Sequence, residues 1–425
     1  MEQKKTAQFM PEMKKDYTIL IPTMLPMHFK MISQIFRNFG YNAVLLENEG
    51  QSVVDCGLKY VHNDTCYPAL LVIGQFIDAI ESGKYDPRKV ALMPTQTGGG
   101  CRASNYISLL RKALEKAGYG YVPVISLNFS GLESSPGFKV TLPMLKQLVF
   151  AVLFGDLLML LRNQCRPYEV NYGATEALCD EWTHKLVSEM SQGKMTYKIV
   201  KQRYADIVSD FHNLPRNNEK RVKVGVVGEI FVKFSPLGNN HLEDFLVSEG
   251  AEVSMPGLVD FCLYCVYNNI MDAELYGMGK AKAAVWRFAF DYVCRKQQDM
   301  IDAIRDNSNF APPTPISHTI ELVRGYIGLG TKMGEGWLLP AEMLELIDSG
   351  VKNIVCAQPF GCLPNHIVGK GMMKPIKERN PNVNIVAIDY DPGATKINQE
   401  NRIKLMLSCS EERRSEKENN VKVNA

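Results

Sequence analysis

The first third of the chain alternates short apolar runs with amphipathic segments. Four runs have the length and composition of buried strands, at 17–24, 41–49, 89–96 and 122–128. Three segments between them repeat apolar residues at helical spacing and end on glycine, at 27–40, 67–83 and 101–118. Strands that alternate with helices predict a parallel sheet with helices on both faces.

The pattern changes at residue 138. Residues 138–214 have helical spacing almost throughout, with breaks near Pro167 and Gly193, and alternation resumes with the strand pattern at 221–232. We therefore predict an α/β fold of two doubly wound parallel-sheet domains of the Rossmann or flavodoxin-like kind, joined by a helical connection. The expected division is an N-terminal arm at 1–15, domains at 16–137 and 220–410, the connection at 138–219, and a charged, frayed tail at 411–425.

Charge and hydropathy narrow the class of protein. The formal net charge of +2 does not indicate a nucleic-acid or acidic-membrane partner. Residues 1–17 lack the apolar segment of a secretory signal. The most apolar stretch, 148–161, contains Asp156 and is too short for a membrane span, so a buried helix is expected there. Together these features favour a soluble cytoplasmic protein.

The chain contains 11 cysteines, which in a cytosolic protein do not indicate a disulfide framework. They also lack the short spacing of a small zinc module. Four lie within helical patterns and are interpreted as ordinary free thiols: Cys165, Cys179, Cys294 and Cys409. Seven lie beside turns, after strands or in a close pair: Cys56, Cys66, Cys101, Cys262, Cys265, Cys356 and Cys362.

Four of these seven follow strands or open helices. Cys101 ends the loop TQTGGGC, Cys66 opens a helix, Cys356 ends the run NIVC, and Cys362 precedes another helix. Loops at the carboxyl ends of parallel strands form the ligand crevice of such sheets, and a helix N-terminus favours the thiolate. We expect at least these four thiols to converge at one edge. The glycines before Cys101 would let the backbone approach a bulky anionic ligand.

The spacing of the thiols bears on which metal they could bind. Structural zinc usually takes its ligands from close pairs, and the one such pair here, Cys262 and Cys265, lies in a helical pattern. Iron–sulfur clusters tolerate thiolates scattered along a chain. The spacing therefore favours an iron–sulfur cluster over zinc.

Four motifs carry a resemblance to a known family: HNDTCYPALLVIGQ (62–75), TQTGGGCRASNY (95–106), VVGEIF (226–231) and CAQPFGCLPNHI (356–367). In this order, within residues 17–405, the chain resembles the cluster-binding component of the 2-hydroxyacyl-CoA dehydratase family, and more closely its double-cubane cluster protein branch. The resemblance implies an [8Fe–9S] double cubane held by six cysteines between the two domains, or a single [4Fe–4S] cubane in the wider family. It also implies a homodimer, and a separate iron–sulfur ATPase of the acetate-kinase/Hsp70-like fold as electron donor.

The resemblance assigns the thiols as follows. Cys66 and Cys101 match the first two ligand positions, and the third is Cys356 or Cys362. Cys265 is the next choice. The sixth ligand is Cys262 or Cys56; the alternatives are a core thiol on a helix face for the first and a loop thiol without a role for the second.

Polar residues near the motifs are candidates for proton transfer and cluster contacts. Glu229, just past the centre of a predicted strand, is either a proton donor or a structural hydrogen-bonding group. His366 either transfers protons or supports the Cys362 loop, and His241 is expected to cap a helix or lie on the surface. The residues flanking Cys101 are candidate cluster contacts, although Arg102 could instead form a surface ion pair: Gln96, Thr97, Gly99, Gly100 and Arg102.

A nucleotide site is not predicted. The chain contains no G-x-x-x-x-G-K-[ST] sequence, and the glycine-rich stretch 325–336 is interpreted as a flexible loop, a lid or a docking surface. ATP would therefore be hydrolysed by the partner. The favoured function is ATP-dependent reduction of small molecules in the cytoplasm of an anaerobe. The alternatives are the [4Fe–4S] component of a 2-hydroxyacyl-CoA dehydratase and a non-catalytic electron carrier.

Overall fold

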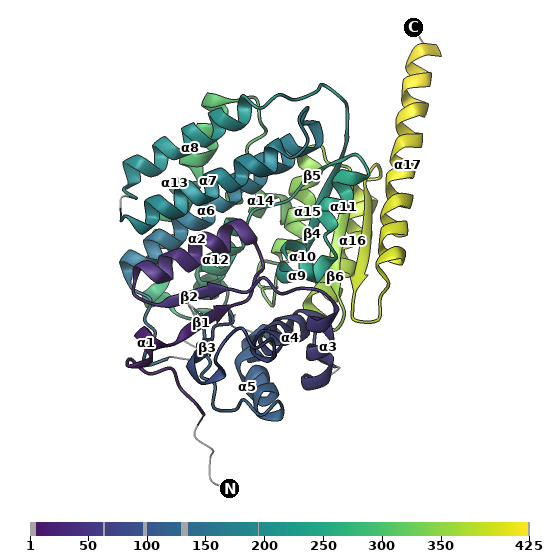
Figure 1. Cartoon of the computed structure of the whole chain (residues 1–425). Coiled ribbons are helices and arrows are strands. Elements are labelled where there is room, and N and C mark those ends of the chain that lie inside the picture. The colour runs from purple at the N-terminus through teal and green to yellow at the C-terminus, as the bar shows by residue number, and fades with distance from the viewer. Residues whose placement is uncertain (1–5, 63, 97–99, 129–134, 194, 424–425) are drawn as a thin grey trace.

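The computed structural model describes residues 6–62, 64–96, 100–128, 135–193 and 195–423, with side chains through Cys409. It is a mixed α/β structure with two parallel sheets, as the alternating pattern predicted (Figure 1). The first sheet has the order β2-β1-β3 and the second β5-β4-β6-β7. The strands are β1 Thr18–Ile21, β2 Asn42–Leu45, β3 Val90–Leu92, β4 Val222–Gly228, β5 Ala251–Ser254, β6 Asn353–Pro359 and β7 Asn384–Tyr390.

The predicted strand at 122–128 runs beside β3 as separate backbone pairings rather than as a regular strand. Parallel bridges join Leu92 to Val124 and Thr95 to Leu127. Pro123 lacks the N–H group that a continuous ladder would use, although its carbonyl accepts a hydrogen bond from Leu92. With this segment included, both halves have the same order, in which their first strand lies between the second and the third.

Four helices accompany the first sheet: α2 Pro26–Asn38, α3 Gln51–Tyr60, α4 Tyr67–Glu81 and α5 Tyr106–Lys116. Only α3 was not predicted. It packs closely on α4 at two glycines, since a Cβ on Gly57 would lie 2.5 Å from Leu70 and one on Gly74 would lie 2.2 Å from the carbonyl oxygen of Val53. Cys56 therefore lies in a helix, and its interpretation as a loop thiol was wrong.

The segment after residue 138 is helical, as predicted, and contains α6 Leu142–Cys165, α7 Ala174–Ser191 and α8 Tyr197–His212. These helices pack with α12 Leu258–Tyr276 and α13 Lys280–Asn307 (Figure 1). In the part of the chain that the structure describes, one helical stretch, 142–168, is long and apolar enough to cross a bilayer, so the expectation that it is too short was wrong. However, 61% of its most apolar window is buried inside the protein, as in the core helix of a soluble protein.

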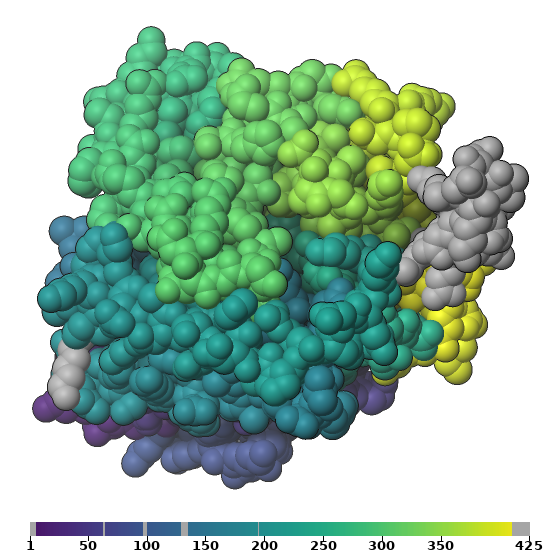
Figure 2. Space-filling model, turned by 90° about the horizontal axis from the view of Figure 1, so that it is seen from above, coloured from purple at the N-terminus to yellow at the C-terminus, as the bar shows by residue number. Residues whose placement is uncertain are grey.

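The short helix α1, Met13–Asp16, precedes β1. The other helices accompany the second sheet: α9 Ile230–Phe234, α10 Pro236–Asn239, α11 Leu242–Ser248, α14 Ile316–Val323, α15 Leu338–Asp348, α16 Gly371–Arg379 and α17 Lys396–Val423. α17 extends beyond the sheet (Figure 1), and its backbone is helical to Val423, so a frayed tail from residue 411 is not observed. Seen from above, the blue and teal surface of the connecting helices lies between the purple N-terminal part and the green second half (Figure 2).

The two halves share their apolar core, in two clusters that each contain side chains from both halves. A single cluster of buried side chains includes Ile19 of β1, Phe154 of α6 and Ile354 of β6. A second cluster joins Leu20 of β1 to Val224 of β4. The halves therefore pack against each other through core side chains as well as through the connecting helices.

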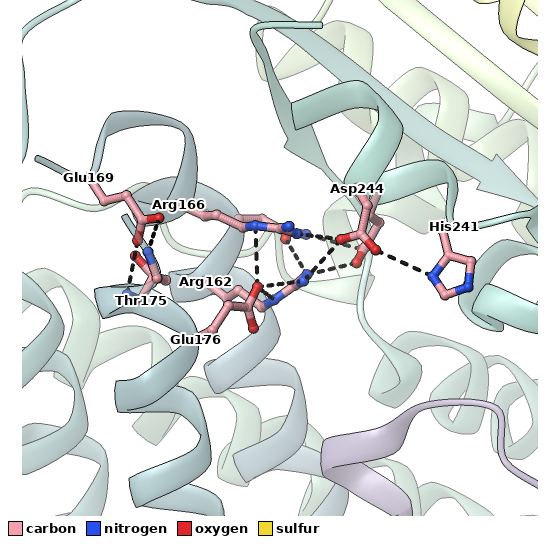
Figure 3. Close-up of polar contacts among 10 residues, drawn as sticks. Arg162, Arg166, Glu169, Thr175, Glu176, His241 and Asp244 are labelled. Carbon is pink, nitrogen blue, oxygen red and sulfur yellow. Dashed lines mark hydrogen bonds and ion pairs between the residues drawn. The ribbon is translucent and has the colours of Figure 1, made fainter. Parts of the chain in front are cut away.

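Ion pairs fasten the connection to the second half (Figure 3). Arg162 lies 2.7 Å from Glu176 and 2.9 Å from Glu243, and Arg166 lies 2.6 Å from Asp244. Burial opposes the charge of Asp244, but Arg166 outweighs it and holds the pKa of this carboxyl below its usual value. His241 makes no capping hydrogen bond; it is exposed and lies 3.3 Å from Asp244, which agrees with a surface role.

Candidate functional site

Loops from both halves meet where the central strands end. In each sheet the first strand lies beside the third, so that β1 neighbours β3 and β4 neighbours β6. Cys101 follows β3, Glu229 follows β4, and Cys362 follows β6. The candidate site is built from these loops and from the start of α4.

Backbone contacts place the Cys362 loop directly on Cys66. The N–H of Tyr67 donates to the carbonyl of Phe360 at 3.0 Å, and the N–H of Phe360 donates to the carbonyl of Tyr390 at 2.8 Å. Gly361 has a φ of +72°, and a Cβ on it would lie 3.2 Å from the Cα of Cys66. Glycine thus permits this approach, and both thiols are buried, with 5% of Cys66 and 6% of Cys362 exposed.

Cys101 joins the site from the first half. It precedes the short 3-10 helix η2, Arg102–Asn105, which leads into α5. In α5, the hydroxyl of Tyr106 lies 3.5 Å from the Sγ of Cys66. On the other side, the N–H of Gly100 donates to the Sδ of Met333 at 2.8 Å, so the glycine-rich loop before Cys101 touches the second glycine-rich loop.

Two buried carboxylates lie beside the thiols. Glu229 is not inside a strand as predicted, because β4 ends at Gly228, where a Cβ would lie 2.2 Å from the carbonyl oxygen of Ala357. Glu229 instead caps α9 and accepts a 2.9 Å hydrogen bond from the N–H of Val232. Glu335 accepts a 3.0 Å hydrogen bond from the N–H of Ile230, so the two acids meet at one helix start.

These surroundings disfavour free thiolates. Burial raises the pKa of Cys66 and Cys362, and it raises the pKa of Cys101 to about 12. The negative charges of Glu229 and Glu335 add to this rise at Cys101 and Cys362, whereas Arg102 lowers the pKa of Cys66. The expected lowering at helix N-termini is therefore outweighed by burial. A bound cationic metal centre would supply the positive charge that ionises these thiols.

Cys356 lies apart from the three thiols. It occupies the middle of β6, opposite Val227 of β4 and Ala387 of β7, and it is fully buried. Its Sγ lies 4.0 Å from the side-chain oxygen of Asn365. The placement of Cys356 at a strand end was wrong, and of the four thiols expected to converge the structure brings together Cys66, Cys101 and Cys362.

The pair on α12 lies at the margin of the site. Cys262 and Cys265 are exposed by surface area, yet protein atoms surround Cys265 closely enough to raise its pKa to about 12, with a further rise from Glu335. The neighbouring Tyr264 donates a 3.0 Å hydrogen bond to the carbonyl of Gly334 and ties α12 to the Glu335 loop. Cys262 lies about one turn earlier, and burial raises its pKa, with further contributions from Cys265, Asp156 and Asp260.

Cys56 lies elsewhere. Its Sγ is 3.8 Å from the carboxylate of Glu81, on the outer side of α3 and α4. Burial, followed by the charges of Glu81 and Asp78, raises its pKa to about 11. Of the two candidates for a sixth ligand, Cys262 lies on α12 with Cys265, and Cys56 lies on α3 beside Glu81.

The predicted polar contacts are supporting residues in this geometry. Gln96 donates to the carbonyl of Ser104 at 2.6 Å and accepts from Ser126 at 2.5 Å, so it braces the backbone around Cys101. His366 is exposed, and its Nδ1 lies 2.6 Å from the amide nitrogen of Gln358. Arg102 is exposed and close enough to act on Cys66. Thr97 and Gly99 lie outside the described residues.

Glu335 is the acid that the sequence analysis missed. It lies in the stretch interpreted as a flexible loop, and only 6% of it is exposed. The sequence offered one signal for this acid, the motif MGEGW, in which the carboxylate stands between two glycines and directly before an apolar helix. Glu335 accepts its hydrogen bond from a backbone N–H more than 100 positions earlier, and no local sequence pattern indicates that contact.

The three thiols can be tested for fit to a metal centre. Over the described ranges, no three His, Cys, Asp or Glu side chains lie close enough to bind a single metal ion. Three thiols form a soft donor set, of the kind that zinc and iron–sulfur centres take. No protein-family model matches the chain, and no curated protein is detectably similar to it in sequence.

Proposed function

We propose that the protein is an iron–sulfur reductase that uses low-potential electrons from a separate ATP-hydrolysing partner to reduce small molecules. The observation that carries the proposal is the meeting of Cys66, Cys101 and Cys362 beside Glu229 and Glu335. Thiols from both halves of the chain lie near one another, and two acids that can hold protons lie next to them. Such a combination suits a reaction that consumes electrons and protons together.

The strand order of the two sheets supports the same location for the site. We infer that each half is a doubly wound, flavodoxin-like unit, because both halves have the strand order in which the first strand lies between the second and third. Ligands of such folds bind where the direction of winding changes. The loops of Cys101, Glu229 and Cys362 follow strands at these points. A cluster held there would lie between the two halves.

Cys66, Cys101 and Cys362 would hold the cluster, with Cys265 and then Cys262 as further ligands of an [8Fe–9S] double cubane. These five thiols are one fewer than the six of the double-cubane branch, so the sixth ligand is left unassigned. When bound, the cluster would supply electrons at low potential. The chain's own residues would exclude water through the buried loops, hold the thiols through Gly361 and Gln96, and keep protons on Glu229 and Glu335. A [4Fe–4S] centre on three thiols is the alternative.

The partners remain proposals. An ATPase would supply electrons, since the sequence has no nucleotide-binding motif of its own. A homodimer is proposed as well. Exposed apolar side chains at the end of α12 and the start of α13 offer a surface for such contact: Leu275, Tyr276, Met278, Val285 and Phe288.

Metal analysis tests the proposal. Protein purified without oxygen should contain about eight irons and nine sulfides per chain for a double cubane, or about four of each for a single cubane. Cys66→Ala, Cys101→Ala and Cys362→Ala should each lose iron, whereas Cys56→Ala and Cys356→Ala, as matched controls, should retain it. Zinc without sulfide in the wild-type protein would contradict the proposal.

A further inference from the structure

A row of acids runs along α15 away from the thiols. Glu335 lies just before the helix, and Glu342 follows seven residues later, two helical turns on. Glu345 and Asp348 then follow at intervals of three residues, which places the acids on one side of the helix. Glu335 and Glu342 are buried, Glu345 is half-buried, and Asp348 is exposed. The row thus leads from the site to the surface, where His318 lies 2.9 Å from Asp348.

Among the described residues, too few positive charges face these acids to keep them all ionised. The buried ammonium of Lys233 lies 2.9 Å from Glu342, and its charge also acts on Glu335 and Glu345. Burial raises the pKa of all three acids, and it raises that of Glu345 to about 7. The charge of one lysine cannot balance several ionised carboxylates in a protein interior, so some acids of the row are protonated near neutral pH.

Two buried side-chain atoms nearby lack a partner among the described residues: Gln358 Oε1 and Asn365 Nδ2. Both residues are fully buried, and they lie where β6 meets the π-helix Asn365–Lys370, which packs against α15. Buried polar atoms of this kind usually bind internal water, and π-helical turns are frequent at functional sites. Cys356, on the same face of β6 as Gln358, is close enough to Glu342 and Glu335 for their charges to raise its pKa.

We propose that Glu345, Glu342 and Glu335 form a proton-entry route from the His318–Asp348 pair to Glu229 beside the thiols. Each step moves one proton from a carboxyl group to the next carboxylate, directly or through water held near Gln358 and Asn365. No electron moves along the row, and each proton delivered is replaced from solvent at His318 and Asp348. Lys233 stabilises the ionised form of Glu342, which can then accept the next proton.

The inference rests on the proposed function, because only a reaction that consumes protons at the thiols requires such a route. The route itself can be measured on iron-free protein. Infrared spectra at neutral pH should contain bands of protonated carboxyl groups, and Glu229→Gln and Glu335→Gln identify the bands of these two residues. On mixing with D2O, the same bands shift as the protons exchange, which gives the rate at which solvent protons arrive.

Glu342→Gln and Glu345→Gln interrupt the row and should slow exchange at Glu229 and Glu335 by roughly tenfold or more. The matched control is Glu321→Gln, an exposed acid of α14 paired with Arg324, which should leave the rate unchanged. Equal rates in all variants would overturn the inference, as would the absence of protonated Glu229 and Glu335 at neutral pH.

If Glu342→Gln does not fold because Lys233 loses its partner, Lys233→Met/Glu342→Leu removes both charges and takes its place. Slowed exchange in this double variant supports the route, and unchanged exchange overturns it. Iron and sulfide analysis of separately purified protein tests the proposed function. Slowed exchange in a protein without iron would support the route and contradict the reductase. Iron and sulfide with unchanged exchange would support the reductase and overturn the route.

Discussion

The carboxylate of Glu335 accepts a 3.0 Å hydrogen bond from the backbone N–H of Ile230, the residue that follows Glu229. This contact joins two segments more than 100 residues apart and brings two buried acids to the start of α9. Repulsion between their charges adds to burial in raising the pKa of Glu229 to about 8. The pair therefore holds at least one proton at neutral pH, next to the thiols.

Glu229 should make stability depend on pH. Its folded-state pKa of about 8 lies above the usual 4.5, so its contribution is fully present below about 4.5 and is lost as pH rises through 8. Urea unfolding of wild type should give a free energy that falls between pH 5 and 9. Glu229→Gln, which retains an acceptor for Val232, should reduce this fall by at least about 1.4 kcal/mol, the equivalent of one pKa unit. Parallel pH profiles would contradict the assignment.

The thiols of iron-free protein should alkylate slowly. With a pKa of about 12 for Cys101 and about 11 for Cys56, the thiolate fraction at pH 8 is small. Reaction with iodoacetamide should be roughly 1,000-fold slower for Cys101 and roughly 100-fold slower for Cys56 than for an unperturbed cysteine. Mass spectrometry of alkylated peptides measures each site, with urea-unfolded protein as the reference. Fast labelling of Cys101 at pH 8 in folded protein would contradict the described surroundings.

Gly361→Ala should disturb the site. The substitution places a side chain at a φ of +72° and 3.2 Å from the Cα of Cys66, so we expect a loss of about 1–3 kcal/mol of stability and a loss of iron. Gly350→Ala is the matched control, because Gly350 also has a positive φ, +90°, but no neighbour within 4 Å. Thermal unfolding and iron content measure both effects. Equal losses of iron in the two variants would show that backbone strain alone is responsible.

Asp156 should stabilise the start of α12. Its carboxylate accepts 2.8 Å hydrogen bonds from Leu258 and Val259 and lies 2.8 Å from His28, all buried. Asp156→Ala removes this cap and leaves the imidazole without its acceptor, so a loss of about 2–4 kcal/mol is expected in urea unfolding. Hydrogen exchange in the first turn of α12 should rise at the same time. Asp180→Ala, an exposed acid of α7, is the control; a similar loss there would argue against capping.

Local patterns in the sequence were sufficient for most of the secondary structure. Gly40, Gly83 and Gly118 mark the ends of three predicted helices, and each has the positive φ that ends a helix there. The alternation of apolar runs and amphipathic segments likewise predicted two parallel sheets. These features depend on a few adjacent residues, which is why sequence alone determined them. The exceptions, α3 and the interrupted strand at 122–128, lack long apolar periodicity or contain proline.

Only the tertiary structure decided which residues share a site. Cys356 and Cys362 lie six positions apart, yet the register of β6 buries the first in the sheet and Gly361 carries the second onto Cys66. Strand order likewise brings Glu335 to Glu229 and Met333 to Gly100. Such contacts depend on how distant strands pair and on which loops then meet, and no local pattern of apolar and polar residues encodes that pairing.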